Sequence, residues 1–142
     1  MKSLAQHLLW FLPMLWLGMV LAISFLEAPL KFRAPGITIP LGLGIGRLVF
    51  RALNTAETLI ALALLAATTV TRPSNPVWWW LGSAVRVLTV QLLAVRPILT
   101  RRTDQVLAGA EGPRSRAHYW YVGLEIGKVI ALIGLALAAA PR

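Results

Sequence analysis

The chain has no cysteine, two histidines and five acidic residues among 142. Without cysteine there is no disulfide, no thiolate nucleophile and no thiolate metal site. Haem held by two imidazoles is excluded within one chain, because His7 and His118 fall at opposite faces of the predicted membrane segments. Charged residues make up 13% of the chain, against about 25% in soluble domains, and hydrophobic residues make up 58%. This composition is typical of an integral membrane protein.

Four apolar runs are each near the ~20 residues that a helix needs to cross a ~30 Å hydrocarbon core. They cover about residues 8–30, 53–71, 77–99 and 118–140. The first run is longer than the apolar region of a signal peptide and has no small-residue cleavage site, so we expect it to be retained. The sequence predicts an all-α polytopic membrane protein, in which residues 1–142 form a single transmembrane domain with four helices in a bundle.

The segment 41–52 precedes the second run and is rich in glycine. A phosphate-binding loop would need a preceding strand and a following Lys-Ser/Thr pair, and neither is present. Arg47 and Arg51 lie four residues apart, on one face of a helix. We therefore predict a short interfacial helix before the second span, with Arg47 and Arg51 reaching lipid headgroups.

Lysine and arginine are divided unevenly between the two ends of the spans. The first and third connections carry nine of them: Lys31, Arg33, Arg47, Arg51, Arg96, Arg101, Arg102, Arg114 and Arg116. The other end carries three: Lys2, Arg72 and Arg142. Because basic loops remain in the cytoplasm, the loop 101–117 is predicted inside and both termini outside.

The net charge of +9 raises the possibility of nucleic-acid binding. The basic residues gather in short loops beside apolar runs, however, where they orient membrane helices and contact anionic headgroups. A bilayer with anionic headgroups is therefore the expected partner, and nucleic acid is not expected.

Glutamates occur inside three different apolar runs, where each carboxylate costs about 2.5–3.5 kcal/mol at helix-centre depth. Two cations, Arg86 and Lys128, also lie within the apolar runs. The predicted intramembrane polar cluster contains Glu27, Glu57, Arg86, Gln91, His118, Glu125 and Lys128. Interhelical ion pairs that fix the packing are the favoured interpretation. A working site, such as a proton relay through Glu57, Glu125 and His118, remains an alternative.

The last span has two different faces at about 100° per residue. His118, Tyr121, Glu125 and Lys128 form one polar stripe. Gly123 and Gly127 form a GxxxG pair on nearly the opposite face, which favours close helix packing, either within the chain or between copies.

Other chemistries find little support. Three glutamates with His118 resemble a set of ligands for a divalent cation, but Arg86 and Lys128 oppose the charge of an ion. A di-iron bundle needs Glu-x-x-His pairs, which are absent. The serines lack a His–acid arrangement. We predict no metal, no cofactor and no catalytic residue, and an enzyme is the less favoured class.

Three segments resemble a family of small bacterial four-span inner-membrane proteins of unknown function. They are residues 24–36 (SFLEAPLKFRAPG), residues 46–54 (GRLVFRALN) with Glu57, and residues 118–128 with the motif YVGLE. The resemblance implies a bacterial inner-membrane location and four spans, and assigns no activity. A structural or accessory subunit, alone as a homo-oligomer or in a larger complex, is the favoured function. A small proton or cation transporter or channel, and a lipid- or quinone-binding protein, are the alternatives.

Overall fold

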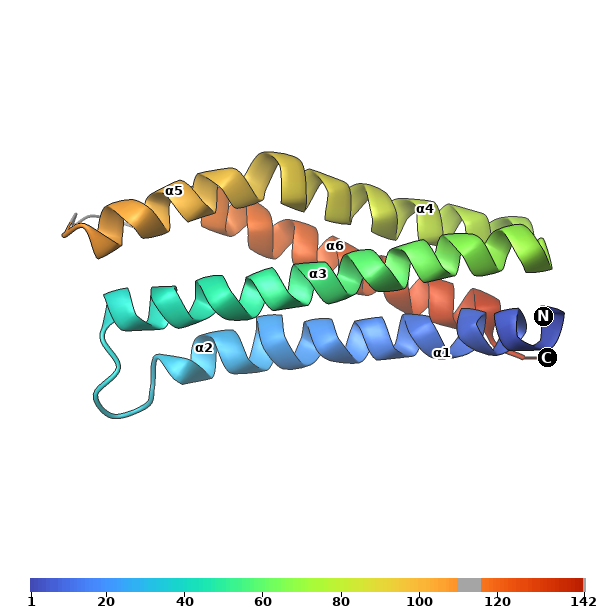
Figure 1. Ribbon diagram of the computed structural model, residues 1–142, viewed down its shortest axis with the longest axis horizontal. Coiled ribbons are helices and arrows are strands. Elements are labelled where there is room, and N and C mark those ends of the chain that lie inside the picture. The colour runs from blue at the N-terminus through green and yellow to red at the C-terminus, as the bar shows by residue number, and fades with distance from the viewer. Residues whose placement is uncertain (110–115, 142) are drawn as a thin grey trace.

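The computed structural model describes residues 1–109 and 116–141, and within them every regular element is a helix. The helices form four rods, of which the fourth is the shortest (Figure 1). The first rod joins α1 (Lys2–Val20), η1 (Leu21–Glu27) and α2 (Ala28–Lys31), and the second is α3 (Ile39–Thr71). The third joins α4 (Asn75–Val90), η2 (Gln91–Val95) and α5 (Arg96–Leu107), and the fourth is α6 (Arg116–Ala139). All four are long and apolar enough to cross a membrane, which confirms the predicted all-α four-helix bundle.

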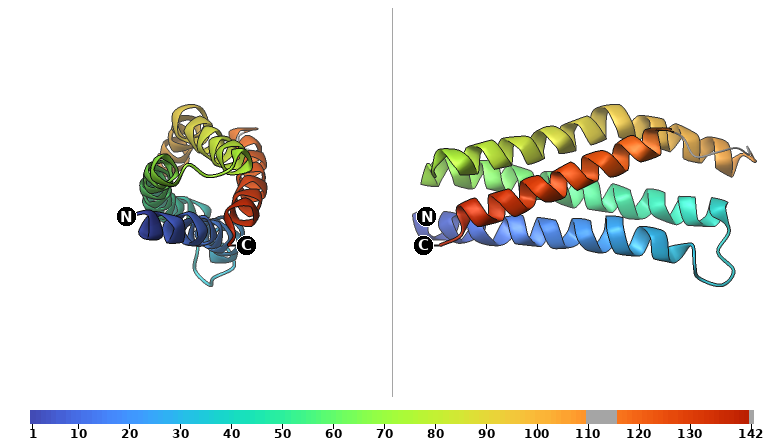
Figure 2. Two further views of the ribbon diagram at one scale, coloured as in Figure 1. Left: turned by 90° about the vertical axis from the view of Figure 1, so that its right-hand side faces the viewer. Right: turned by 180° about the vertical axis from the view of Figure 1, so that it is seen from behind.

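The rods surround a common centre when the molecule is seen along its long axis (Figure 2, left). α1 packs against both α3 and α6, and α4 packs against α6. Both termini and the α3–α4 turn lie at one end, which we call the termini end (Figure 1). The α2–α3 connection and α5 lie at the other, which we call the basic end because it holds Lys31, Arg47, Arg51 and Arg96.

Two rods contain a π-helical segment, and each segment ends two residues before a proline. η1 precedes Pro29, and η2 precedes Pro97. Proline has no backbone N–H, and its ring collides with the carbonyl four residues earlier, so the preceding turn widens. The wider turns set the direction of Ser24 and Gln91, which both reach the same carboxylate in the bundle centre.

The connections at the two ends are short and have defined caps. Thr38 caps α3 by accepting the backbone N–H of Leu41 at 3.2 Å, and Pro40 occupies the first turn, where its missing N–H costs nothing. α3 ends at Arg72, which adopts a left-handed conformation with φ of 47°. This cap turns the chain directly into α4.

The structure corrects two of the predicted boundaries. Segment 41–52 is no separate interfacial helix, because α3 is continuous over its 33 residues. The third rod runs to Leu107, well into the predicted loop 101–117, of which residues 110–115, including Arg114, lie outside the described residues. At 1.5 Å per residue, α3 is about 50 Å long and exceeds the ~30 Å hydrocarbon core by about 20 Å. The glycines of segment 41–52 do not interrupt the helix. Proline would interrupt it, and none follows Pro40 in this rod.

The half of the bundle nearer the termini end has a largely apolar core. The side chains of Trp16, Leu64, Leu132 and Leu135 are completely buried there. The outward face is also apolar, with Leu59, Leu62, Leu137 and many similar residues exposed. An apolar exterior of this kind suits contact with lipid tails.

Candidate functional site

A fully buried ion cluster lies in the bundle centre. The ammonium nitrogen of Lys128 lies 2.5 Å from Glu57 Oε2 and 2.6 Å from Glu125 Oε1. It also donates a hydrogen bond to Gln91 Oε1 at 2.8 Å. All four residues are at most 1% exposed. We call these four residues the central network.

Two neutral donors from the first rod complete the central network. The indole N–H of Trp16 donates to Glu57 Oε2 at 2.7 Å, and the hydroxyl of Ser24 donates to Glu125 Oε2 at 2.7 Å. The amide nitrogen of Gln91 adds a longer bond of 3.4 Å to Glu125 Oε1. All four rods therefore contribute polar groups to one place. Neither Trp16 nor Ser24 was predicted as part of the cluster, although a serine within an apolar run was a usable signal.

Glu27 stays outside the central network. Its carboxylate is half-buried in η1 and lies 3.7 Å from the ammonium of Lys31, one turn further along the same rod. One of its oxygens, Oε2, is buried and has no hydrogen-bond partner in the described part of the chain. The three intramembrane glutamates therefore divide into a central pair and one separate residue near the basic end.

Arg86 was predicted in the polar cluster, and the structure corrects this. Its side chain is exposed on the outer face of α4. The buried positions on that helix include Ala84 and Leu88, and Arg86 lies about 200° around the helix from each of them. It points to the lipid side, where a long side chain can extend toward a headgroup.

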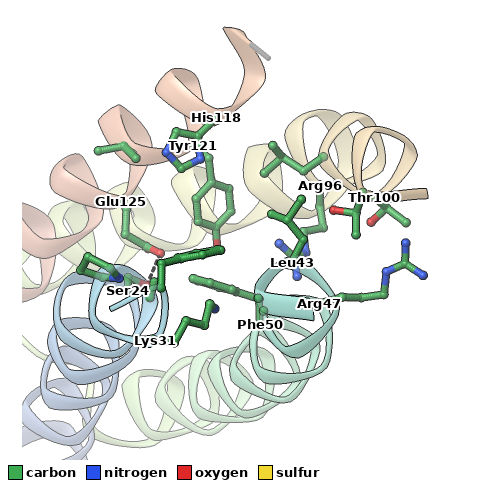
Figure 3. A pocket seen from close by; sticks show the side chains of 18 of the residues that line it. Ser24, Lys31, Leu43, Arg47, Phe50, Arg96, Thr100, His118, Tyr121 and Glu125 are labelled. Carbon is green, nitrogen blue, oxygen red and sulfur yellow. Dashed lines mark hydrogen bonds between the residues drawn. The ribbon is translucent and has the colours of Figure 1, made fainter. Parts of the chain in front are cut away.

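A cavity of about 340 Å³ lies between the central network and the basic end. Glu125 and Ser24 line one side of it, while Arg47 and Thr100 line the other (Figure 3). His118, predicted as part of the polar cluster, lies on the wall of this cavity and is half-buried. The carboxylate of Glu125 therefore belongs both to the central network and to the cavity.

Aromatic rings and cations alternate along the cavity wall. The guanidinium of Arg96 lies 5.2 Å from the ring centroid of Phe50 and 5.9 Å from that of Tyr121. The two rings meet edge to face with centroids 5.7 Å apart. The ammonium of Lys31 lies 5.9 Å from the ring centroid of Phe50. Cation–π contacts hold both cations in place without neutralising them.

Three donors on this wall lack a full complement of partners. The buried hydroxyl of Tyr121 lies beside the carboxylate of Glu125 but forms no hydrogen bond of ordinary geometry there. Nε of Arg47 is buried and has no hydrogen-bond partner within the described ranges. Among the same residues, the guanidinium of Arg96 has no carboxylate partner, while Arg47 pairs through its terminal nitrogen with Asp104. Buried polar groups normally find a partner, so unsatisfied ones on a cavity wall point to a ligand.

The two predicted headgroup-binding arginines differ in burial. Arg47 is half-buried and lines the cavity, whereas Arg51 is exposed. A second, shallower hollow of about 260 Å³ is lined by Arg47, Arg51, Asn54 and Arg96. Three guanidinium groups thus converge at the basic end of α3.

The predicted packing glycines face away from the bundle. A Cβ on Gly123 or on Gly127 would meet no atom within 4 Å, so this face of α6 packs against no described part of the chain. Gly134, on the same helix, is different, because a Cβ there would overlap the ring of Trp80. Packing within the chain therefore uses Gly134, and the GxxxG pair lies open.

No family model, curated protein or solved structure matches this chain. Within residues 1–109 and 116–141, no group of three or more histidine, aspartate and glutamate side chains is placed to hold a metal ion.

Proposed function

We propose that this chain is an integral membrane protein that binds the phosphate of a membrane lipid headgroup in the cavity at its basic end. The proposal rests on the buried hydroxyl of Tyr121 and Nε of Arg47, which have no hydrogen-bond partner among the described residues. Beside them lies the guanidinium of Arg96, which pairs with no carboxylate in the same part of the chain. An anionic oxygen placed among them would accept charge-assisted hydrogen bonds, which are stronger than neutral ones. The lipid-binding alternative thus has the most direct support among the functions that the sequence left open.

The depth of the cavity supports a lipid ligand. Arg47 lies 24 residues from the end of α3 at Thr71, or about 36 Å at 1.5 Å per residue. Arg96 lies 21 residues from the start of α4 at Asn75, or about 32 Å. With the termini end at one membrane surface, both guanidinium groups come to the headgroup level of the other surface, since the hydrocarbon core is about 30 Å thick.

The packing beyond the central network favours binding over conduction. An ion that passed Glu125 and Lys128 toward the termini end would next meet the fully buried side chains of Trp16, Leu64 and Leu132. Charged species cross such apolar packing only at high cost. The central network therefore fits the interpretation as interhelical ion pairs, and the chain fits an accessory membrane protein that carries a lipid site.

The position in the cell follows from the charge distribution. The excess of lysine and arginine at the basic end supports a cytoplasmic location for the cavity. In that orientation the site draws on the inner leaflet, where anionic lipids attract basic residues by about 1 kcal/mol each. A bacterial inner membrane is the proposed location, on the resemblance described above.

Native mass spectrometry of protein extracted gently from its own membrane tests the proposal. We expect one phospholipid to remain bound per chain, and Arg96→Gln to lower its occupancy by about 10-fold, since one lost charge-assisted hydrogen bond costs about 1.5–3 kcal/mol. Arg86→Gln is the matched control, because this arginine is exposed on α4 away from the cavity. A wild-type protein that retains no lipid, or equal occupancy in both variants, would contradict the proposal.

A further inference from the structure

Among the described residues that line the cavity, Glu125 is the one carboxylate, and Lys31, Arg47 and Arg96 are cations. Glu125, Ser24 and Lys31 lie on the side formed by the first and fourth rods, and Arg47 and Arg96 lie on the side formed by the second and third (Figure 3). The ring of Phe50 lies between them. A ligand that fills this space meets an acceptor at one end and strong donors at the other.

With both glutamates ionised, the central network carries a net charge of −1. Two carboxylates, Glu57 and Glu125, share the single ammonium of Lys128. The remaining partners, Trp16, Ser24 and Gln91, are neutral. An uncompensated carboxylate inside a bilayer is expensive, and such residues normally pair. Of the two, Glu125 is the one that reaches the cavity wall.

Resting on the proposed function, we propose that the cavity selects a phospholipid whose headgroup carries a primary amine. The ammonium binds the carboxylate of Glu125 and supplies the missing positive charge. The phosphate accepts from the guanidinium of Arg96, the hydroxyl of Tyr121 and Nε of Arg47. One headgroup therefore satisfies both sides of the cavity.

The remaining lining suits the start of the lipid tails. Phe25 and Val122 line the cavity and are also exposed on the outer surface of η1 and α6. Apolar side chains thus flank the cavity where it meets the lipid. A lipid can keep its headgroup in the cavity while its tails stay in the bilayer. A water-soluble ligand with the same headgroup has no tails to contact these apolar side chains.

The first test varies the lipid and leaves the protein unchanged. Wild-type protein in detergent is titrated with phosphatidylethanolamine, its N-methyl and N,N-dimethyl forms, phosphatidylcholine and phosphatidylglycerol, and the bound fraction is read by native mass spectrometry. We expect phosphatidylethanolamine to bind at least about 10-fold more tightly than phosphatidylcholine, with affinity falling at each methylation, because each methyl group removes a donor from the nitrogen. Phosphatidylglycerol should also bind at least about 10-fold more weakly than phosphatidylethanolamine.

The second test locates the selectivity. Glu125→Gln should bring phosphatidylethanolamine and phosphatidylglycerol to within about 2-fold of each other while phosphatidylglycerol still binds. Arg86→Gln, the control, should keep the wild-type preference. Equal affinities for all five lipids in the wild-type protein would overturn the amine assignment but keep the proposed function, whereas failure of every lipid to bind would overturn both.

A third titration separates lipid from free headgroup. Glycerophosphoethanolamine carries the same phosphate and amine without tails. We expect it to bind at least about 10-fold more weakly than phosphatidylethanolamine, because the tails bury apolar surface against residues such as Phe25 and Val122. Equal affinity would overturn the assignment to a membrane lipid and give the site to the soluble headgroup.

Discussion

The ammonium nitrogen of Lys128 lies 2.5 Å from the Glu57 carboxylate, and both side chains are completely buried. These residues belong to α6 and α3, which lie across the bundle from each other and both pack against α1 (Figure 2). The ion pair therefore links two helices that lie on opposite sides of the bundle centre. Lys128 also contacts the carboxylate of Glu125, which lines the cavity. The ion pair that fixes the packing of the helices is therefore in contact with the cavity wall.

Removing this ammonium should be the most damaging single change in the central network. Lys128→Met keeps a similar length but leaves Glu57 and Glu125 buried together without a cation. We expect a loss of about 3–5 kcal/mol in the free energy of unfolding, the usual cost of breaking a buried ion pair by removing one partner. Denaturant unfolding in detergent micelles, followed by circular dichroism, measures it.

Arg86→Met is the control for that experiment, because it removes a cation at a comparable depth from an exposed position. We expect a change below about 0.5 kcal/mol, as for most surface substitutions. Equal losses in the two variants would mean that the central network does not stabilise the bundle.

The shared face of Tyr121, Glu125 and Lys128 was predictable from the sequence, because several polar residues on one helix define a stripe, and all three are buried. The direction of Arg86 was not predictable, and it points outward. In a soluble protein the polar outer face of a helix reveals which side is buried. Here the outer face is as apolar as the core, so an isolated polar residue such as Arg86 carries no such signal.

The π-helical segments were a second obstacle. Counting at about 100° per residue assumes a regular α-helix, and each π-helical turn rotates everything beyond it relative to that count. The directions of Ser24 and Gln91 toward Glu125 could therefore not be obtained from spacing. Pro29 and Pro97 marked where the irregular turns occur, but not how far they rotate the chain.

The bond from Trp16 to Glu57 should make a measurable contribution of its own. Trp16→Phe keeps an aromatic ring but removes the only donor that the first rod offers to Glu57, among the bonds that the described residues form. We expect a loss of about 1.5–3 kcal/mol in the free energy of unfolding, typical of a hydrogen bond to a charged group. Trp79→Phe is the matched control, since Trp79 is 71% exposed, and it should change stability by less than about 0.5 kcal/mol.

Glycines of α6 should respond in opposite directions to substitution by alanine. Gly134→Ala forces a methyl group into the ring of Trp80 and should cost about 1–3 kcal/mol, the range for an overpacked core. Gly127→Ala enters open space and should stabilise the helix by up to about 1 kcal/mol. Thermal unfolding of both variants in detergent tests the pair, and destabilisation by Gly127→Ala under conditions where the protein is oligomeric would instead indicate that copies pack through this face.

The orientation of the bundle can be measured directly, because the chain has no cysteine and any cysteine introduced is the only thiol. Ala34 and Ser74 are both exposed, in the α2–α3 connection and at the start of α4 respectively. Since basic loops stay in the cytoplasm, a membrane-impermeant maleimide applied to intact spheroplasts should label Ser74→Cys at once and Ala34→Cys only after permeabilisation. The two sites lie at opposite ends of α3, so each serves as the control for the other. The reverse pattern would place the cavity at the outer surface, and the lipids available to Arg96 and Glu125 would then be those of the other leaflet.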